Sequence, residues 1–151
     1  MPTAIRGDKI HLSSEKKTEE LANKLIKKIK PGNIVFLFGE MGVGKTTFAR
    51  YLINGFQKLN KIKITEVTSP TFNLLNEYPI NKFKLNHYDL FRLKSFDEIK
   101  NLDLFDEVTN AITLIEWPEI IKVRPKNLIE LIFEYGKDHK TRYVLVKGVN
   151  L

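Results

Sequence analysis

The spacing of apolar residues predicts two amphipathic helices flanking a buried strand. Between residues 18 and 29 apolar side chains recur every three or four positions, with Thr18 as the expected N-cap. Residues 33–38 are apolar at nearly every position, which is typical of a central strand covered by helices on both faces. A glycine-rich turn at 39–44 leads into a second apolar stripe over 45–59. This segment is expected to be a helix packed back onto the sheet.

The middle of the chain predicts strands of a different kind. Residues 72–78 and 83–90 alternate like strands, and the four residues between them are too few for a crossover helix, so we expect antiparallel pairing. Residues 9–12 suggest a short edge strand. The apolar run at 111–115 ends at Glu116-Trp117-Pro118, where the proline should stop the strand.

The remaining patterns complete one domain. Ser95 and Glu98 match a capping box, which predicts a short helix running towards Leu102. Residues 128–134 and 142–147 alternate around a turn at 135–138, like a C-terminal hairpin. We therefore expect a single α/β domain over residues 1–151, with a central, mostly parallel sheet and antiparallel additions.

Composition narrows the functional classes. The chain has 151 residues, a net charge of +7 and no cysteine, which excludes disulfides, thiolate nucleophiles and cysteine-ligated metals. The apolar runs are far shorter than the roughly 20 residues that span a bilayer, and no signal peptide is evident, so we expect a cytoplasmic protein without a membrane role. Lysines make up most of the positive charge, and a solvated surface explains them better than direct RNA binding does.

The glycine-rich turn carries the strongest chemical signal. It matches G-x-x-x-x-G-K-[ST] at every position: Gly39, Glu40, Met41, Gly42, Val43, Gly44, Lys45 and Thr46. Backbone N–H groups of such a loop surround a phosphate, the lysine approaches the terminal phosphates, and the hydroxyl reaches Mg²⁺. Thr47 is a candidate contact for the α-phosphate. The motif makes the expected fold a P-loop NTPase-type sandwich.

Phosphate chemistry also needs a carboxylate at the end of a neighbouring strand. Glu116 directly follows an apolar run, the position of a Walker B acid. Asp89 lies between apolar neighbours at the end of another predicted strand. Both are candidates for contact with the metal or the attacking water.

Several features are missing. No N-K-x-D motif occurs, which disfavours a GTPase, and the five arginines are too scattered for the lid of a small-molecule kinase. His11, His87 and His139 lack metal-ligand spacing, so each is expected to be a surface or packed histidine.

Four segments together resemble one known family. They are GEMGVGKTT, the SPTF stretch at 69–72, HYDLFRL at 87–93 and LIEWPE at 114–119. In this order they are similar to the motifs of the bacterial TsaE family, formerly YjeE, and the resemblance covers about residues 8–147. Phe91 and Asn73 depart from the common family residues, Tyr and Thr, without touching the phosphate chemistry.

The resemblance implies an ATP- and Mg²⁺-dependent ATPase that acts on a complex of TsaD and TsaB. That complex places threonylcarbamoyl groups on the adenosine next to the anticodon of tRNAs reading codons that begin with A, so contact with tRNA would be indirect. Lys45, Asp89 and Glu116 then match the catalytic residues, with Thr46, Glu116 and Asp89 at the metal. The resemblance also implies a switch-like loop at 69–72 and an aromatic at Trp117 tied to activity or partner contact. It places Thr18 and Arg142 near the nucleotide.

Two other functions stay open. One is a nucleotide-gated binding module that does not need turnover, and the other is a small-molecule P-loop kinase. No arginine of the chain is clearly placed as a finger on the phosphates, although Arg50 and Arg92 lie near the motifs. We therefore expect weak ATP hydrolysis without a partner.

Overall fold

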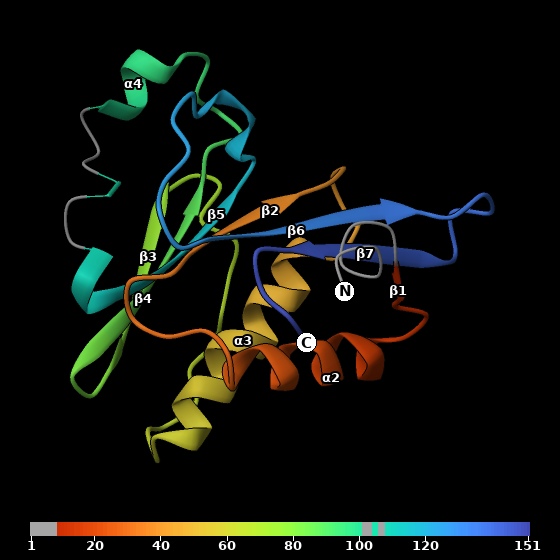
Figure 1. Cartoon of the computed structure of the whole chain (residues 1–151), viewed down its shortest axis with the longest axis horizontal. Helices are drawn as coiled ribbons and strands as arrows, with labels where there is room; N and C mark the ends of the chain where they lie inside the picture. The colour runs from red at the N-terminus through yellow and green to blue at the C-terminus, as the bar shows by residue number, and fades with distance from the viewer. Residues whose placement is uncertain (1–8, 101–103, 106–107) are drawn as a thin grey trace.

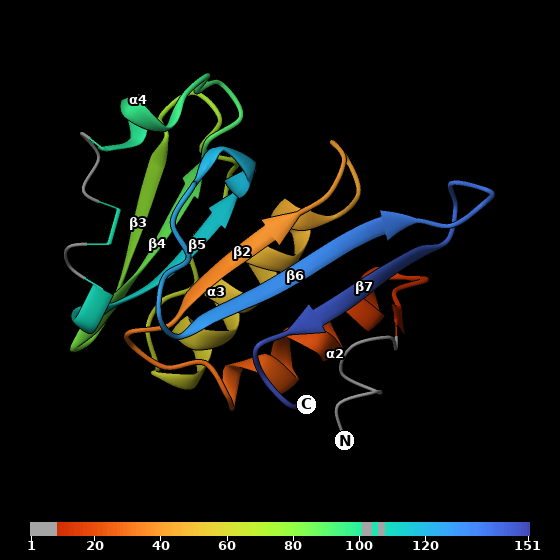
Figure 2. The ribbon, with the colours of Figure 1, turned by 45° about the horizontal axis from the view of Figure 1, so that its top comes forward.

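The fold is a twisted mixed sheet with its parallel strands at the centre. A computed structural model describes residues 9–100, 104–105 and 108–151. In this part of the chain the sheet has seven strands in the order β1-β7-β6-β2-β5-β4-β3 (Figure 2). Their bounds are Ile10–His11 (β1), Ile34–Phe38 (β2), Leu75–Ile80 (β3), Phe83–Asp89 (β4), Ala111–Glu116 (β5), Leu128–Tyr135 (β6) and Arg142–Lys147 (β7).

The strand directions confirm the expected α/β sheet. β2 pairs in parallel with both β5 and β6, and β4 pairs in parallel with β5. The antiparallel additions lie outside this core, because β3 pairs with β4 and the C-terminal hairpin places β7 against β6. β1 adds a two-residue antiparallel strand at the edge. The carboxyl ends of β2, β4 and β5 thus meet at one edge of the sheet.

Both faces of the central strand β2 are buried, as its uninterrupted apolar sequence predicts. The long helices α2 (Glu15–Ile26) and α3 (Lys45–Leu59) cover one face (Figure 1), where they pack on the side of β2 that carries Val35 and Leu37. The opposite face, with Ile34 and Phe36, packs against a smaller cluster that includes α4 (Phe96–Lys100). Two short 3-10 turns, Val108–Asn110 and Pro118–Ile120, flank β5.

Several predicted boundaries are wrong. The first helix begins at Glu15, and its N-cap is Ser14, whose side chain accepts a hydrogen bond from the Lys17 backbone N–H. Thr18 is therefore not the cap but a buried residue inside the first turns. The prediction placed the cap at the first residue of the apolar stripe, whereas three polar residues extend the helix before that stripe begins.

The strand predicted over 72–78 is also shifted. β3 begins at Leu75, after Leu74 in a left-handed conformation with φ of 68°, and Phe72 lies in a turn and is 82% exposed. The strand continues through Pro79, which a sheet edge tolerates because no further strand needs its missing N–H. The predicted helix towards Leu102 is α4, and Leu102 itself lies outside the described residues.

The contact between α3 and the sheet should dominate stability, and Phe48 is its centre. Phe48 is fully buried, with its ring centroid 5.9 Å from that of Phe133 on β6. We expect Phe48→Ala to lower the free energy of unfolding by about 3–5 kcal/mol, through lost burial and a residual cavity. Urea unfolding measures the loss. Leu59→Ala, at an exposed position of the same helix, is the control and should change little; equal losses in the two variants would contradict the assignment.

Candidate functional site

The loop between β2 and α3 has a backbone that only glycines can follow. Gly39 has φ of 146°, and a Cβ there would lie 2.8 Å from Val43 Cγ1 and 2.9 Å from the Phe133 carbonyl oxygen. Gly44, with φ of 119°, is the N-cap of α3 and offers no side chain to its first N–H groups. These amides are therefore free for an anion at the positive end of the helix.

Lys45 is buried in this loop. Its side chain is 4% exposed, and its Nζ donates a hydrogen bond to the Gly39 carbonyl oxygen at 2.5 Å. The same Nζ lies 3.6 Å from the ring centroid of Trp117. Burial lowers the pKa of Lys45, while the carboxylates of Glu116, Glu119 and Asp89 act in the opposite direction. The loop thus buries an ammonium group whose hydrogen-bond acceptor is a neutral carbonyl oxygen.

Glu116 connects the loop to the sheet. It is the last residue of β5 and 3% exposed. The Thr46 hydroxyl, at the start of α3, donates towards Glu116 Oε2 at 3.0 Å and Oε1 at 3.2 Å. On the next strand, His87 places its Nε2 2.7 Å from the same Oε2. Two of the three residues predicted to bind the metal, Thr46 and Glu116, are therefore in direct contact.

Asp89 lies beside Glu116 and holds the loop at 69–72. The two acids are register partners at the carboxyl ends of β4 and β5. Asp89 Oδ2 accepts hydrogen bonds from the Thr71 hydroxyl at 2.9 Å and from the Ser69 hydroxyl at 3.4 Å, and its Oδ1 accepts one from the Phe91 backbone N–H at 2.9 Å. The segment that resembles a switch loop is thus fastened to this carboxylate.

Trp117 forms an aromatic wall beside Lys45. It has left-handed backbone angles, φ of 57° and ψ of 55°, which are rare for a bulky residue and occur mostly at functional sites. Its ring packs against that of Phe91, with 4.9 Å between centroids. The structure leaves Trp117 half-buried at the site.

Two adjoining cavities meet at the start of α3. The first has a volume of about 400 Å³, and its walls include Lys45, Thr46, Asp89 and Glu116. The second, of about 310 Å³, is lined by Thr18 and by the start of α2. Gly44, Thr47 and Arg142 border both. Met41 and Gly42 line the first cavity and Val43 the second, whereas Gly39 and Glu40 line neither, although the Gly39 carbonyl oxygen holds Lys45.

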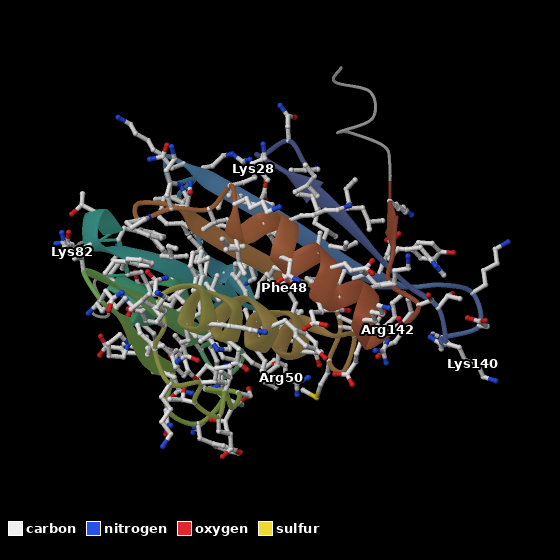
Figure 3. The ribbon with its side chains drawn as sticks, turned by 90° about the horizontal axis from the view of Figure 1, so that it is seen from below. Lys28, Phe48, Arg50, Lys82, Lys140 and Arg142 are labelled. Atoms are coloured by element: carbon white, nitrogen blue, oxygen red, sulfur yellow. The ribbon has the colours of Figure 1, made fainter. Side chains whose placement is uncertain are left out.

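The arginines near the motifs differ in whether they border the two cavities. Figure 3 shows Arg50 and Arg142 near the same end of the two long helices. Arg50 is paired with Glu15 at 2.7 Å, and the guanidinium of Arg92 lies over the ring of Phe72, 5.5 Å from its centroid. Of the arginines that the structure describes, Arg142 is therefore the one that borders the cavities.

The donor set suits a hard cation shared with phosphates. Among the described residues no group of three or more His, Asp or Glu side chains could hold a metal alone. One hydroxyl and one or two carboxylates are what Mg²⁺ uses when phosphate oxygens and waters complete its shell. Thr46, Glu116 and Asp89 fit that pattern.

Comparison with known proteins shows the family of this chain. Residues 12–144 match the family described as threonylcarbamoyl adenosine biosynthesis protein TsaE. The chain belongs to the TsaE family. A Rickettsia bellii protein named tRNA threonylcarbamoyladenosine biosynthesis protein TsaE is 45% identical over 130 residues, covering 85% of this chain and 88% of its own. Its namesake from Nostoc is 33% identical over 135 residues, covering 86% and 80%.

A solved structure shares the fold of this TsaE-family chain. The crystal structure of Bacillus subtilis YdiB superposes with a TM-score of 0.64 at 22% identity, covering 91% of this chain and 83% of its own. The expected P-loop NTPase-type α/β fold is thereby confirmed. Within the described residues no helix is long and apolar enough to cross a membrane.

Burial of Lys45 predicts a pH dependence of stability. Because its pKa is lowered in the folded state, the unfolded chain binds more protons between that pKa and the ordinary value of 10.5. The wild type should therefore gain stability relative to Lys45→Met as pH rises through this window. Urea unfolding of both proteins between pH 7 and 10 measures the difference. Lys58→Met removes an exposed cation from the same helix and serves as the control; a pH-independent difference at Lys45 would contradict the prediction.

Proposed function

We propose that this protein is a Mg²⁺-dependent ATPase, folded as one domain over residues 1–151, that serves tRNA threonylcarbamoyladenosine biosynthesis in the cytoplasm. It acts on a TsaB–TsaD complex and meets tRNA only through that complex. The observation that carries the proposal is the contact between the Thr46 hydroxyl and Glu116, at 3.0 and 3.2 Å. It joins the phosphate loop to the strand-end acid across 70 positions of the chain.

The loop would bind the phosphates of ATP. Free N–H groups at the start of α3 surround the phosphate oxygens, and Lys45 exchanges the Gly39 carbonyl for the terminal phosphates. The adjoining cavity beside Thr18, Thr47 and Arg142 would take the ribose and base. Preference for adenine over guanine rests on the missing N-K-x-D motif and on the family.

Thr46 and Glu116 would hold Mg²⁺, with Asp89 close to it. When bound there, the ion supplies positive charge to the phosphate oxygens. Asp89 would orient the attacking water, and the Ser69 and Thr71 hydroxyls that donate to it would keep the loop at 69–72 near the terminal phosphate. Lys45 stabilises charge that develops on the phosphate oxygens.

A partner would have to complete charge neutralisation. Arg50 and Arg92 are engaged elsewhere, as their contacts with Glu15 and Phe72 show. Arg142 borders both cavities, but its guanidinium lies over the Tyr135 ring, 5.8 Å from the centroid, and the proposal assigns it to the ribose and base. A cation supplied in trans to a phosphoryl-transfer site raises the rate by about 10³ to 10⁵. Weak hydrolysis by the isolated protein and strong stimulation by TsaB–TsaD follow from this incomplete site.

The first test measures ATP hydrolysis with Mg²⁺, alone and with TsaB–TsaD. We expect stimulation of about 10³-fold or more, because the partner supplies the missing charge. Lys45→Ala is the blank and should show none. Full turnover by the isolated protein, or no effect of the complex, would contradict a partner-completed ATPase.

One observation favours a second function, a nucleotide-gated binding module. Both oxygens of Asp89 already accept hydrogen bonds from the 69–72 loop and from Phe91, so this carboxylate could couple nucleotide state to loop position without catalysing turnover. Asp89→Asn separates the two functions.

If the protein is an ATPase, we expect Asp89→Asn to lower the stimulated rate of ATP hydrolysis by about 10²-fold or more, because the attacking water is no longer oriented. The variant should still bind ATP. tRNA modification by the reconstituted system should fall in parallel. Undiminished modification with abolished hydrolysis would favour the module. Asp97→Asn, the same change at an exposed position of α4, is the matched control and should change neither readout.

A further inference from the structure

His87 is the buried group of the site to which the proposed chemistry assigns no role. It lies on β4 with no exposed surface, two residues before Asp89 on the same face of the strand. Its Nε2 is 2.7 Å from Glu116 Oε2, while its Nδ1 has no hydrogen-bond partner among the described residues. Burying the Nδ1 nitrogen without a hydrogen-bond partner costs free energy. The contact of Nε2 with Glu116 is therefore the one polar interaction described for this buried ring.

The sheet register explains how the two side chains meet. His87 is the register partner of Leu114, and Glu116 follows Leu114 by two positions on the same face of β5. His87 is therefore the diagonal neighbour of Glu116, within reach of a long side chain. Leu85 and Leu114 of this face belong to the core beneath α3, so packing fixes the backbone on both sides of the contact.

The hydrogen-bonding requirements of Glu116 and of the His87 ring indicate which ring nitrogen of His87 carries the proton. The Glu116 carboxylate accepts hydrogen bonds and the Thr46 hydroxyl already donates to it. A ring carrying its proton on Nε2 donates to Glu116 and leaves only an acceptor unpaired at Nδ1. The other tautomer would set two acceptors 2.7 Å apart and bury an unpaired N–H, which is much less favourable.

We propose that His87 is a positioning residue for the metal-binding carboxylate, acting as an Nε2–H donor that fixes the rotation of Glu116. Oε2 is held by His87 and Thr46, whereas Oε1 has only the longer 3.2 Å contact with Thr46, and Glu116 lines the cavity. The inference rests on the proposed function, because it concerns how Glu116 meets Mg²⁺. Mutating such a hydrogen-bond partner of a metal ligand typically lowers metal affinity by about 10- to 100-fold.

The test measures how Mg²⁺ tightens binding of the non-hydrolysable ATP analogue AMP-PNP, by calorimetry at graded Mg²⁺ and in EDTA. In His87→Leu, an apolar side chain of similar size, we expect the half-saturating Mg²⁺ concentration to rise about 10-fold or more. Binding in EDTA should be unchanged, because the phosphate loop is intact. His87→Gln, whose amide N–H reaches a similar point, should recover most of the Mg²⁺ effect.

Asn86→Leu is the matched control, because it replaces a buried polar side chain on the opposite face of the same strand. It should leave the Mg²⁺ dependence as in the wild type. An unchanged half-saturating concentration in folded His87→Leu overturns the inference, and so does an equal loss of affinity in EDTA and in Mg²⁺, which marks a merely structural residue.

A direct measurement covers the case in which His87→Leu does not fold. Nitrogen-15 spectra of the histidine rings in the wild type should show His87 protonated at Nε2 and bare at Nδ1, and the reverse pattern overturns the inference. Failure of the proposed function gives a different result from failure of the role of His87. If wild-type AMP-PNP binding ignores Mg²⁺, both ideas fall, whereas Mg²⁺ dependence that survives in His87→Leu removes only the role of His87.

Discussion

The carboxylate of Glu116 is where three separate parts of the chain meet, and the rest of the site depends on it. Thr46 reaches it from the first turn of α3, His87 from β4, and the carboxylate itself ends β5. A carboxylate that is 3% exposed is stable only with donors on its oxygens. The hydrogen bonds that satisfy this requirement also fix how the phosphate loop lies on the sheet.

The same edge of the sheet concentrates charges that water would otherwise solvate. Lys45, Asp89 and Glu116 are each at most 4% exposed. Their mutual attraction only partly offsets the desolvation of Lys45, as its lowered pKa shows. The large apolar core under α2 and α3 supplies the stability that holds these charges in place. Strain at Trp117 adds to the cost, which is typical of a site built for binding and not for stability.

Local patterns pointed to residues that the structure brings together where one segment carried the whole signal. The phosphate loop needs eight consecutive residues, and Glu116 needs only an apolar run before it, so both were visible in the sequence. Phe72 misled the strand prediction because an aromatic residue normally reads as buried, yet it is 82% exposed. Thr18 misled the cap prediction because the polar residues 15–17 belong to the helix but not to its apolar stripe.

Contacts between distant segments escaped prediction from the residues alone. His87 lies 29 positions from Glu116, and only the parallel pairing of β4 with β5 brings the two together. The histidine was expected to be packed or exposed, and it is packed, but its packing gave no sign of a carboxylate neighbour. The spacing of His87 and Asp89 placed both on one strand face, which was the available signal.

The contacts around Lys45 also couple the phosphate loop to the surface. Its ammonium group lies on the Trp117 ring, that ring packs on Phe91, and the Phe91 backbone N–H is bound to Asp89. Asp89 in turn holds Thr71, next to the exposed Phe72. In the proposed ATPase, phosphates that draw Lys45 away from Gly39 would disturb every member of this series. Because close-packed contacts transmit strain, a shift of Lys45 in the proposed ATPase would reach the 69–72 loop through this series.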